Sequence, residues 1–201
     1  MKLTHSNIVS VFLMATSQEF VDGTKWYLDA NLIAQEIAKH GCSLEQASGV
    51  IAALSPSNKW QRNCQDAENF IRLWAAGGDP MELKVCTYGS NKKKALSILD
   101  GETGGESIED ILSGRKVSAF YRCILGKSDS VCVDGHAYSI WLGERIPTNK
   151  TPKIGKLLYE SISNDYRLAT ELINNYTDKQ LAPYQVQAVT WLAWRRIVGA
   201  R

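Results

Sequence analysis

The chain has 201 residues, of which 44% are hydrophobic and 22% charged, and its formal net charge is +2. This composition is typical of a folded domain with a sizeable core, and it excludes a disordered chain. The small net charge also excludes a general basic field over the molecule. Any contact with nucleic acid would therefore rest on local groups of basic residues.

Five cysteines are scattered along the chain, and none lies in a C-x-x-C pair or in another metal-ligand spacing. We therefore expect no metal site, no iron–sulfur cluster and no other cofactor. Free thiols are typical of a reducing compartment, and the N-terminal residues do not have the pattern of a signal peptide. No run approaches the roughly 20 apolar residues of a membrane span. The sequence predicts a cytoplasmic protein without a membrane partner.

Apolar residues recur at helical spacing along most of the chain, which predicts an all-α fold. Asp22–Gly23 is expected to form a turn, with Thr24 capping the next helix. Ser43–Gln46 has the pattern of a capping box, and the helix that it opens is so apolar that it should be buried centrally. Residues 100–105 are expected to form a loop. Around ten helices are expected, over residues 5–15, 24–38, 43–54, 61–75, 91–99, 107–125 (two helices), 131–144, 152–163, 166–176 and 183–198.

The central apolar helix should end at Ser55-Pro56, because proline lacks an N–H group and biases the residue before it away from helix. A polar and aromatic loop follows, Ser57-Asn58-Lys59-Trp60. One interpretation is structural, with Trp60 capping the next helix and packing on Phe70 or its neighbours. The other is functional, with Asn58 and Trp60 as the best candidates for ligand contacts and Arg62 as a less certain one.

Residues 107–125 have the pattern of a helix, a turn and a second helix, with Ser107 and Asp110 capping the first. The second helix begins at Gly114-Arg115-Lys116. Eighteen residues after Lys116, Asp134 follows a short apolar run and precedes another helical pattern, so we expect its carboxylate to be an N-cap. Its helix should lie within residues 131–144.

Basic residues are grouped rather than spread evenly. The groups are Lys92-Lys93-Lys94, then Arg115, Lys116, Arg122 and Lys127, and finally Arg195, Arg196 and Arg201. Three consecutive lysines cannot share one helical face, so solvated side chains are a better interpretation of the first group than three phosphate contacts. The groups are compatible with DNA and equally with a plain solvated surface.

The sequence G-R-K, followed eighteen residues later by V-D-x-H, resembles the helix-hairpin-helix (HhH-GPD) DNA glycosylases of the endonuclease III type. The resemblance is close over about thirty residues and looser back to Ala53–Ser55. It implies a fold of two helical lobes with a cleft between them, formed by residues 1–201 as one compact monomeric unit. It also implies that Lys116 attacks the sugar and that Asp134 is the catalytic aspartate.

The resemblance further implies that the partner is double-stranded DNA with a flipped base. The expected DNA contacts come from the polar loop, the hairpin and the helix after Asp134, namely Ser57, Asn58, Lys59, Trp60, Arg62, Gly114, Arg115 and His136. The expected location is the cytoplasm, on the nucleoid or inside an infected host cell.

Two departures from the family pattern indicate a divergent member. The family's G-V-G hairpin is Leu112-Ser113-Gly114 here, so only the second glycine is kept, and a Cβ at Leu112 would impede a phosphate. The C-terminal cysteines that hold an iron–sulfur cluster in many relatives are absent. Small size, altered hairpin and missing cluster together suggest a phage-encoded protein.

Three functions follow as hypotheses. The first is a DNA glycosylase, with AP-lyase activity, that excises a damaged or modified base. The second is a transferase on the same scaffold that modifies an activated thymine derivative in phage DNA, in which Lys116 forms no covalent adduct. The third is a DNA-binding relative that has lost the reaction.

Overall fold

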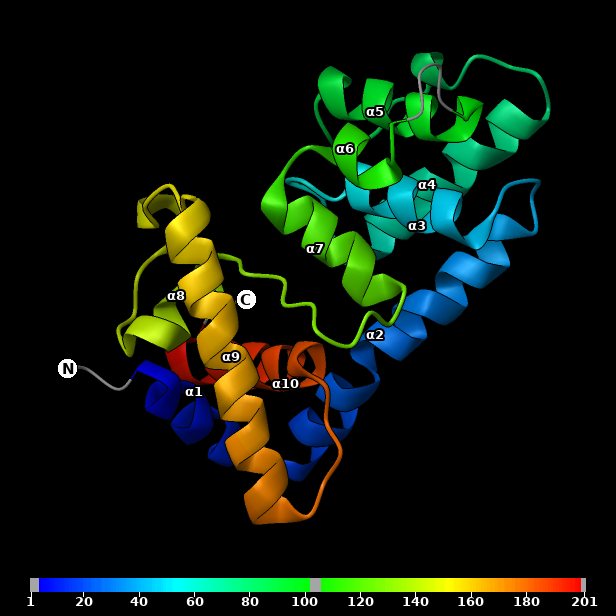
Figure 1. The fold of residues 1–201 in the computed structure, drawn as a ribbon. Coiled ribbons are helices and arrows are strands. Elements are labelled where there is room, and N and C mark those ends of the chain that lie inside the picture. Colours follow the sequence, from blue (N-terminus) through cyan, green and yellow to red (C-terminus); the bar gives the residue numbers. More distant parts are fainter. Residues whose placement is uncertain (1–3, 102–105, 200–201) are drawn as a thin grey trace. The chain divides into compact units, whose positions relative to one another are not determined.

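The computed structural model describes residues 4–101 and 106–199, and over these ranges it is all-helical, as predicted. Within them the chain forms ten α-helices and two 3₁₀ helices, without a strand (Figure 1). Residues 102–105 of the expected 100–105 loop and Arg201 lie outside the described residues. The helices are α1 Thr4–Leu13, α2 Ser17–Ala38, α3 Leu44–Leu54, α4 Trp60–Ala75, η1 Pro80–Glu82, α5 Gly89–Asp100, α6 Ile108–Leu112, α7 Arg115–Ile124, α8 Gly135–Leu142, η2 Thr148–Lys150, α9 Lys156–Thr177 and α10 Pro183–Val198.

The chain divides into two compact units. The first consists of Met1–Leu28 and Gly126–Arg201, and it contains α1, α8, α9, α10 and the beginning of α2. The second is Asp29–Leu125, with the rest of α2 and α3 to α7. Lys116 therefore belongs to the second unit and Asp134 to the first.

Helix α3 is the centre of the second unit, packed among α4, α5, α6 and α7 (Figure 1). Every residue from Ala47 to Leu54 is buried, which confirms the predicted central helix. The predicted capping box is also confirmed, since Ser43 accepts from the Gln46 N–H. A Cβ on Gly49 would lie 2.9 Å from the Ile108 side chain on α6 and 3.2 Å from the Ile98 side chain on α5. The missing side chain of this glycine therefore lets both helices pack closely against α3.

The predicted turn at Asp22–Gly23 is wrong, because α2 runs unbroken from Ser17 to Ala38. Gly23 is there for packing, since a Cβ on it would lie 2.6 Å from the Cα of Val189 on α10. Thr24 is not an N-cap either. Its hydroxyl donates back to the Phe20 carbonyl at 2.8 Å, inside the helix.

The two helices predicted over 152–163 and 166–176 are a single helix, α9, which begins only at Lys156. The polar run Ser163-Asn164-Asp165 does not interrupt it because each side chain has a compatible role. The Ser163 hydroxyl donates to the Tyr159 carbonyl at 2.9 Å, and Asp165 accepts from the Trp141 indole N–H at 2.6 Å. Tyr166 on the next position is fully buried.

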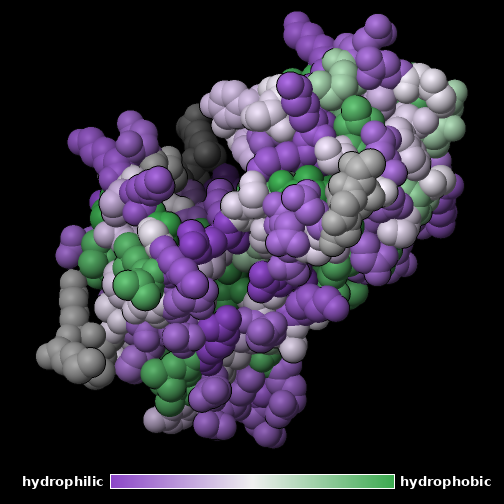
Figure 2. Space-filling view, turned by 45° about the horizontal axis from the view of Figure 1, so that its top comes forward, coloured by the Kyte–Doolittle hydropathy of each residue, from purple (hydrophilic) through white to green (hydrophobic). Residues whose placement is uncertain are grey.

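The surface is mostly hydrophilic on the face drawn in Figure 2, with hydrophobic side chains in separate small groups. Exposed apolar residues include Leu13, Leu157 and Tyr176. None of the helices over residues 4–101 and 106–199 is both long and apolar enough to cross a membrane.

Candidate functional site

The hairpin predicted over 107–125 consists of α6, a two-residue turn at Ser113-Gly114, and α7. The left-handed backbone conformation falls on Ser113, with φ 55°, whereas Gly114 is extended at φ −114°. A Cβ on Gly114 would meet no neighbour closer than 3.8 Å. Neither the conformation nor the packing of this unit therefore requires glycine at 114, and its missing side chain leaves the start of α7 open to approach from outside.

Lys94 on α5 holds the turn of this hairpin. Its ammonium donates to the Leu112 carbonyl at 2.7 Å and to the Ser113 hydroxyl at 2.6 Å. A cation at the last carbonyls of α6 satisfies acceptors that the helix cannot. The solvated interpretation of the three lysines is wrong for Lys94 and for Lys92, whose ammonium donates to the carbonyls of Met81 and Leu83. Only Lys93 is exposed.

Arg115 and Lys116 form the exposed first turn of α7. Phe120 lies one turn further along, on the same helical face as Lys116. The Trp60 indole packs edge-on against the Phe120 ring, with centroids 6.2 Å apart. The polar loop and the helix of Lys116 thus lie side by side in the second unit.

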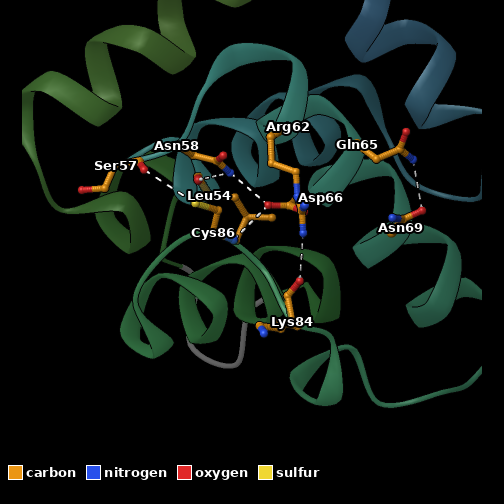
Figure 3. Close-up of polar contacts among 9 residues, drawn as sticks. All are labelled: Leu54, Ser57, Asn58, Arg62, Gln65, Asp66, Asn69, Lys84 and Cys86. Carbon is orange, nitrogen blue, oxygen red and sulfur yellow. Dashed lines mark hydrogen bonds and ion pairs between the residues drawn. The ribbon is translucent and has the colours of Figure 1, made fainter.

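A buried carboxylate, Asp66 on α4, anchors the polar loop (Figure 3). Its oxygens accept from the Asn58 side chain at 3.0 Å, the Cys86 backbone N–H at 3.0 Å and the Arg62 Nε at 2.6 Å. The Asn58 amide also donates to the Leu54 carbonyl. Asn58 and Arg62, both predicted to contact DNA, therefore help to fix the loop in this structure.

Two other side chains of the polar loop are exposed to solvent. Ser57, with φ 62°, and Lys59, the N-cap residue of α4, are both exposed. The backbone below them is held by the Thr87 hydroxyl, which donates to the Pro56 carbonyl at 3.0 Å. Ser57 and Lys59 are consequently presented on a rigid turn.

A shallow polar pocket of about 220 Å³ opens beside Asp66, between α4 and residues 83–85. Its walls include Arg62, Gln65 and Lys84, and Figure 3 shows Arg62 reaching the carboxylate while the Gln65 amide is turned toward Asn69. The ion pair with Asp66 raises the pKa of Arg62. The pocket is lined neither by Lys116 nor by the hairpin, so it is separate from the predicted reaction centre.

In the first unit, Asp134 is the N-cap of α8, as predicted. Its Oδ1 accepts from the Ala137 N–H at 2.8 Å. Within the described part of the chain, Oδ2 accepts no hydrogen bond from the protein. Asp134 is half-buried, and one of its two oxygens is fixed by the first turn of α8.

The approach to Asp134 is held by Tyr159 of α9. Its buried hydroxyl donates to the Val131 carbonyl at 2.9 Å and accepts from the Val133 N–H at 3.1 Å. Val131, Cys132 and Val133 are all buried, as predicted. One phenol therefore fixes the extended backbone that ends at Asp134.

His136 lies in the first turn of α8, and its ring packs perpendicular to the Trp191 indole on α10, with centroids 6.2 Å apart. Deeper in the same unit, burial raises the pKa of Tyr166, and the charge of Asp134 adds to this effect. The Tyr166 hydroxyl lies 3.4 Å from that of Thr190. Asp134 thus lies near the α9–α10 packing of the first unit.

A model described as a family of unknown function, DUF7178, matches residues 1–197. The chain belongs to the DUF7178 family. No curated protein and no solved structure matches it.

The DUF7178 chain carries its predicted site residues on two separate units. The structure brings Trp60 beside the helix of Lys116 and Arg115, and it places His136 in the first turn of the helix that Asp134 caps. Three residues important to these arrangements were missed by the sequence, namely Asp66, Lys94 and Tyr159. Asp66 has a weak sequence signal, its i,i+4 spacing from Arg62. Lys94 and Tyr159 have none, because their partners are 18 to 28 residues away.

Proposed function

We propose that this protein is a DNA glycosylase with AP-lyase activity, in which Lys116 is the nucleophile and Asp134 the catalytic carboxylate. The observation that carries the proposal is the local geometry of the motif. Lys116 lies on the exposed first turn of the helix after the hairpin, and Asp134 is an N-cap with one oxygen fixed by the first turn of α8. The resemblance to the helix-hairpin-helix glycosylases requires both features.

The chemistry assigns a separate task to each group. An enzyme that acts on a base must first take it out of the stack. Cleavage of the bond between the base and C1′ builds positive charge on the sugar, which the Asp134 carboxylate would stabilise. The amine of Lys116 would form a bond to C1′ as the bond from C1′ to the base breaks and the base takes the electron pair. An ordinary lysine is protonated at neutral pH, and the proton that the ammonium loses would leave with the base. The resulting Schiff base permits β-elimination, which breaks the bond to the 3′ phosphate.

The DNA contacts proposed for the second unit agree with this assignment. Ser57 and Lys59 are exposed on a turn that Asp66 and Thr87 hold. Trp60 joins this turn to α7 through Phe120. We propose that the turn contacts the strand near the extruded base and that Gly114 and Arg115 contact its backbone.

The experiment is borohydride trapping on an oligonucleotide with an abasic site. Wild type is compared with Lys116→Ala, Asp134→Asn and the matched control Lys93→Ala, an exposed lysine of the same unit. We expect a covalent protein–DNA band that Lys116→Ala abolishes, Asp134→Asn weakens strongly and Lys93→Ala leaves unchanged. A band of equal strength in Lys116→Ala would disprove the assignment of the nucleophile.

A base-modifying transferase is the second candidate, and the altered hairpin favours it. Ser113 has the left-handed conformation here, and the Lys94 ammonium occupies the hairpin carbonyl. A transferase would use Asp134 in its site, and Lys116 would form no covalent adduct with the sugar. The transferase would be supported if wild-type protein binds the abasic oligonucleotide without forming a trapped covalent band and releases no base from intact DNA.

A further inference from the structure

Arg195 on α10 differs in its surroundings from the arginine next to it. Arg196 is bound by a full set of acceptors, with Nε 2.7 Å from Glu19 Oε1 and an Nη donating to the Met14 carbonyl at 2.7 Å. The guanidinium of Arg195 instead lies over the Trp191 ring, 4.5 Å from its centroid. Helix α10 contains no acidic residue, and within residues 4–101 and 106–199 no carboxylate pairs with Arg195.

Trp191 connects this guanidinium to the helix of Asp134. The guanidinium of Arg195 lies over the face of the indole, and the His136 ring packs against the indole in a perpendicular arrangement. His136 is two residues after Asp134, in the first turn of α8, and α8 packs against α10. All three side chains are half-buried. A cation and an imidazole are therefore held on one aromatic side chain, in the same unit as the predicted catalytic carboxylate.

We propose that Arg195 and His136 bind a backbone phosphate of DNA beside the nucleotide that Asp134 contacts. The proposal rests on the proposed function, and it adds to it a phosphate contact in the first unit. A stacked guanidinium keeps its N–H edge free while its plane is fixed, which suits bidentate binding of phosphate. The positive charge beside Asp134 also complements the strand on which this carboxylate would act.

The test is the salt dependence of DNA binding, measured by fluorescence anisotropy on a duplex with a reduced abasic analogue that cannot react. Each phosphate contact contributes about 0.9 to the slope of log K against log salt. Arg195→Gln is expected to lower the slope by about one and to weaken binding about five- to tenfold at 0.1 M salt. Arg195→Lys should keep the slope and regain part of the affinity, because it keeps the charge and loses the planar fork.

Lys179→Gln is the matched control, since the Lys179 ammonium lies over the Phe20 ring, 4.8 Å from its centroid, in the same unit. It removes the same charge from another cation–aromatic pair and should leave the slope unchanged. Circular dichroism of each variant shows whether it is folded.

Two outcomes would overturn the inference. One is a salt slope that stays unchanged in folded Arg195→Gln. The other is an equal decrease of the slope in Lys179→Gln, which would show that the effect comes from the loss of any positive charge. Failure here is distinguishable from failure of the proposed function. If wild type forms the trapped covalent band but Arg195→Gln leaves the salt slope unchanged, the lyase assignment stands and this phosphate contact is disproved. If Arg195→Gln lowers the slope but wild type forms no trapped band, the phosphate contact stands and the lyase assignment is disproved.

Discussion

Single side chains decide how the two predicted catalytic residues are presented. Asp134 is aimed by a capping bond to Ala137, and the chain before it is fixed by one phenol, that of Tyr159. Lys116 lies in the first turn of α7. Its helix is oriented by the hairpin turn, which Lys94 holds from α5.

Tyr159→Phe should destabilise the first unit and slow the reaction without removing any group that touches DNA. It leaves the Val131 carbonyl and the Val133 N–H without the phenol, at a cost of about 1–3 kcal/mol. Urea unfolding measures the loss, and single-turnover trapping measures the misplacement of Asp134. Tyr176→Phe is the control, since Tyr176 is 86% exposed and should change neither quantity. Unchanged stability and trapping in Tyr159→Phe would contradict its positioning role.

Asp66→Asn tests whether this carboxylate orders the polar loop. The substitution replaces one acceptor oxygen by a donor that faces the N–H groups of Asn58, Arg62 or Cys86. We expect a loss of about 1–3 kcal/mol in the free energy of unfolding and weaker DNA binding.

The control for this prediction is Glu36→Gln, which breaks an exposed ion pair of the same unit, with Lys39, and should cost well under about 1 kcal/mol. Equal effects of the two substitutions would show that Asp66 has no special role.

At the scale of the elements, local signals predicted what depends on local chemistry. The capping box at Ser43, the apolar α3 and the bounds Pro183–Val198 of α10 were all predicted, because caps, prolines and apolar spacing act within a few residues. The mistakes came from distant partners. Gly23 was interpreted as a turn residue because nothing near it in sequence reveals Val189. The predicted gap between residues 163 and 166 includes Asp165, whose partner Trp141 is 24 residues away.

Gly23→Ala tests that explanation. Alanine favours a helix over glycine by about 1 kcal/mol, but here its Cβ would overlap the backbone of Val189. We expect the effect of this overlap to exceed the gain in helix propensity. The free energy of unfolding, measured by thermal or urea unfolding, should fall by about 1–3 kcal/mol. Gly89→Ala, at the start of α5 with no atom within 4 Å of the added Cβ, should be neutral or stabilising. A stabilised Gly23→Ala protein would show that α2 and α10 adjust freely.

At the scale of the whole molecule, the predicted pair is divided between two units, each with its own core. Residues 29–125 carry the hairpin, Lys116 and the polar loop, whereas Asp134, His136 and Arg195 belong to the unit made by both ends of the chain. The sequence could nominate the motif because its spacing is local to residues 114–136. It could not nominate Tyr159 or the contact of Trp191 with His136, since helices distant in sequence bring these side chains to their partners.

The central claim is that Lys116 and Asp134 act on one sugar, and a double-mutant cycle tests it most directly. Single-turnover nicking of an abasic oligonucleotide is measured for wild type, Lys116→Ala, Asp134→Asn and the double variant, all at saturating protein. Groups that act as a unit give strongly non-additive losses. We predict that each single substitution slows nicking at least ~100-fold and that the double variant is no slower than the worse single one. Losses that multiply, or a wild-type rate in either single variant, would contradict a shared reaction centre.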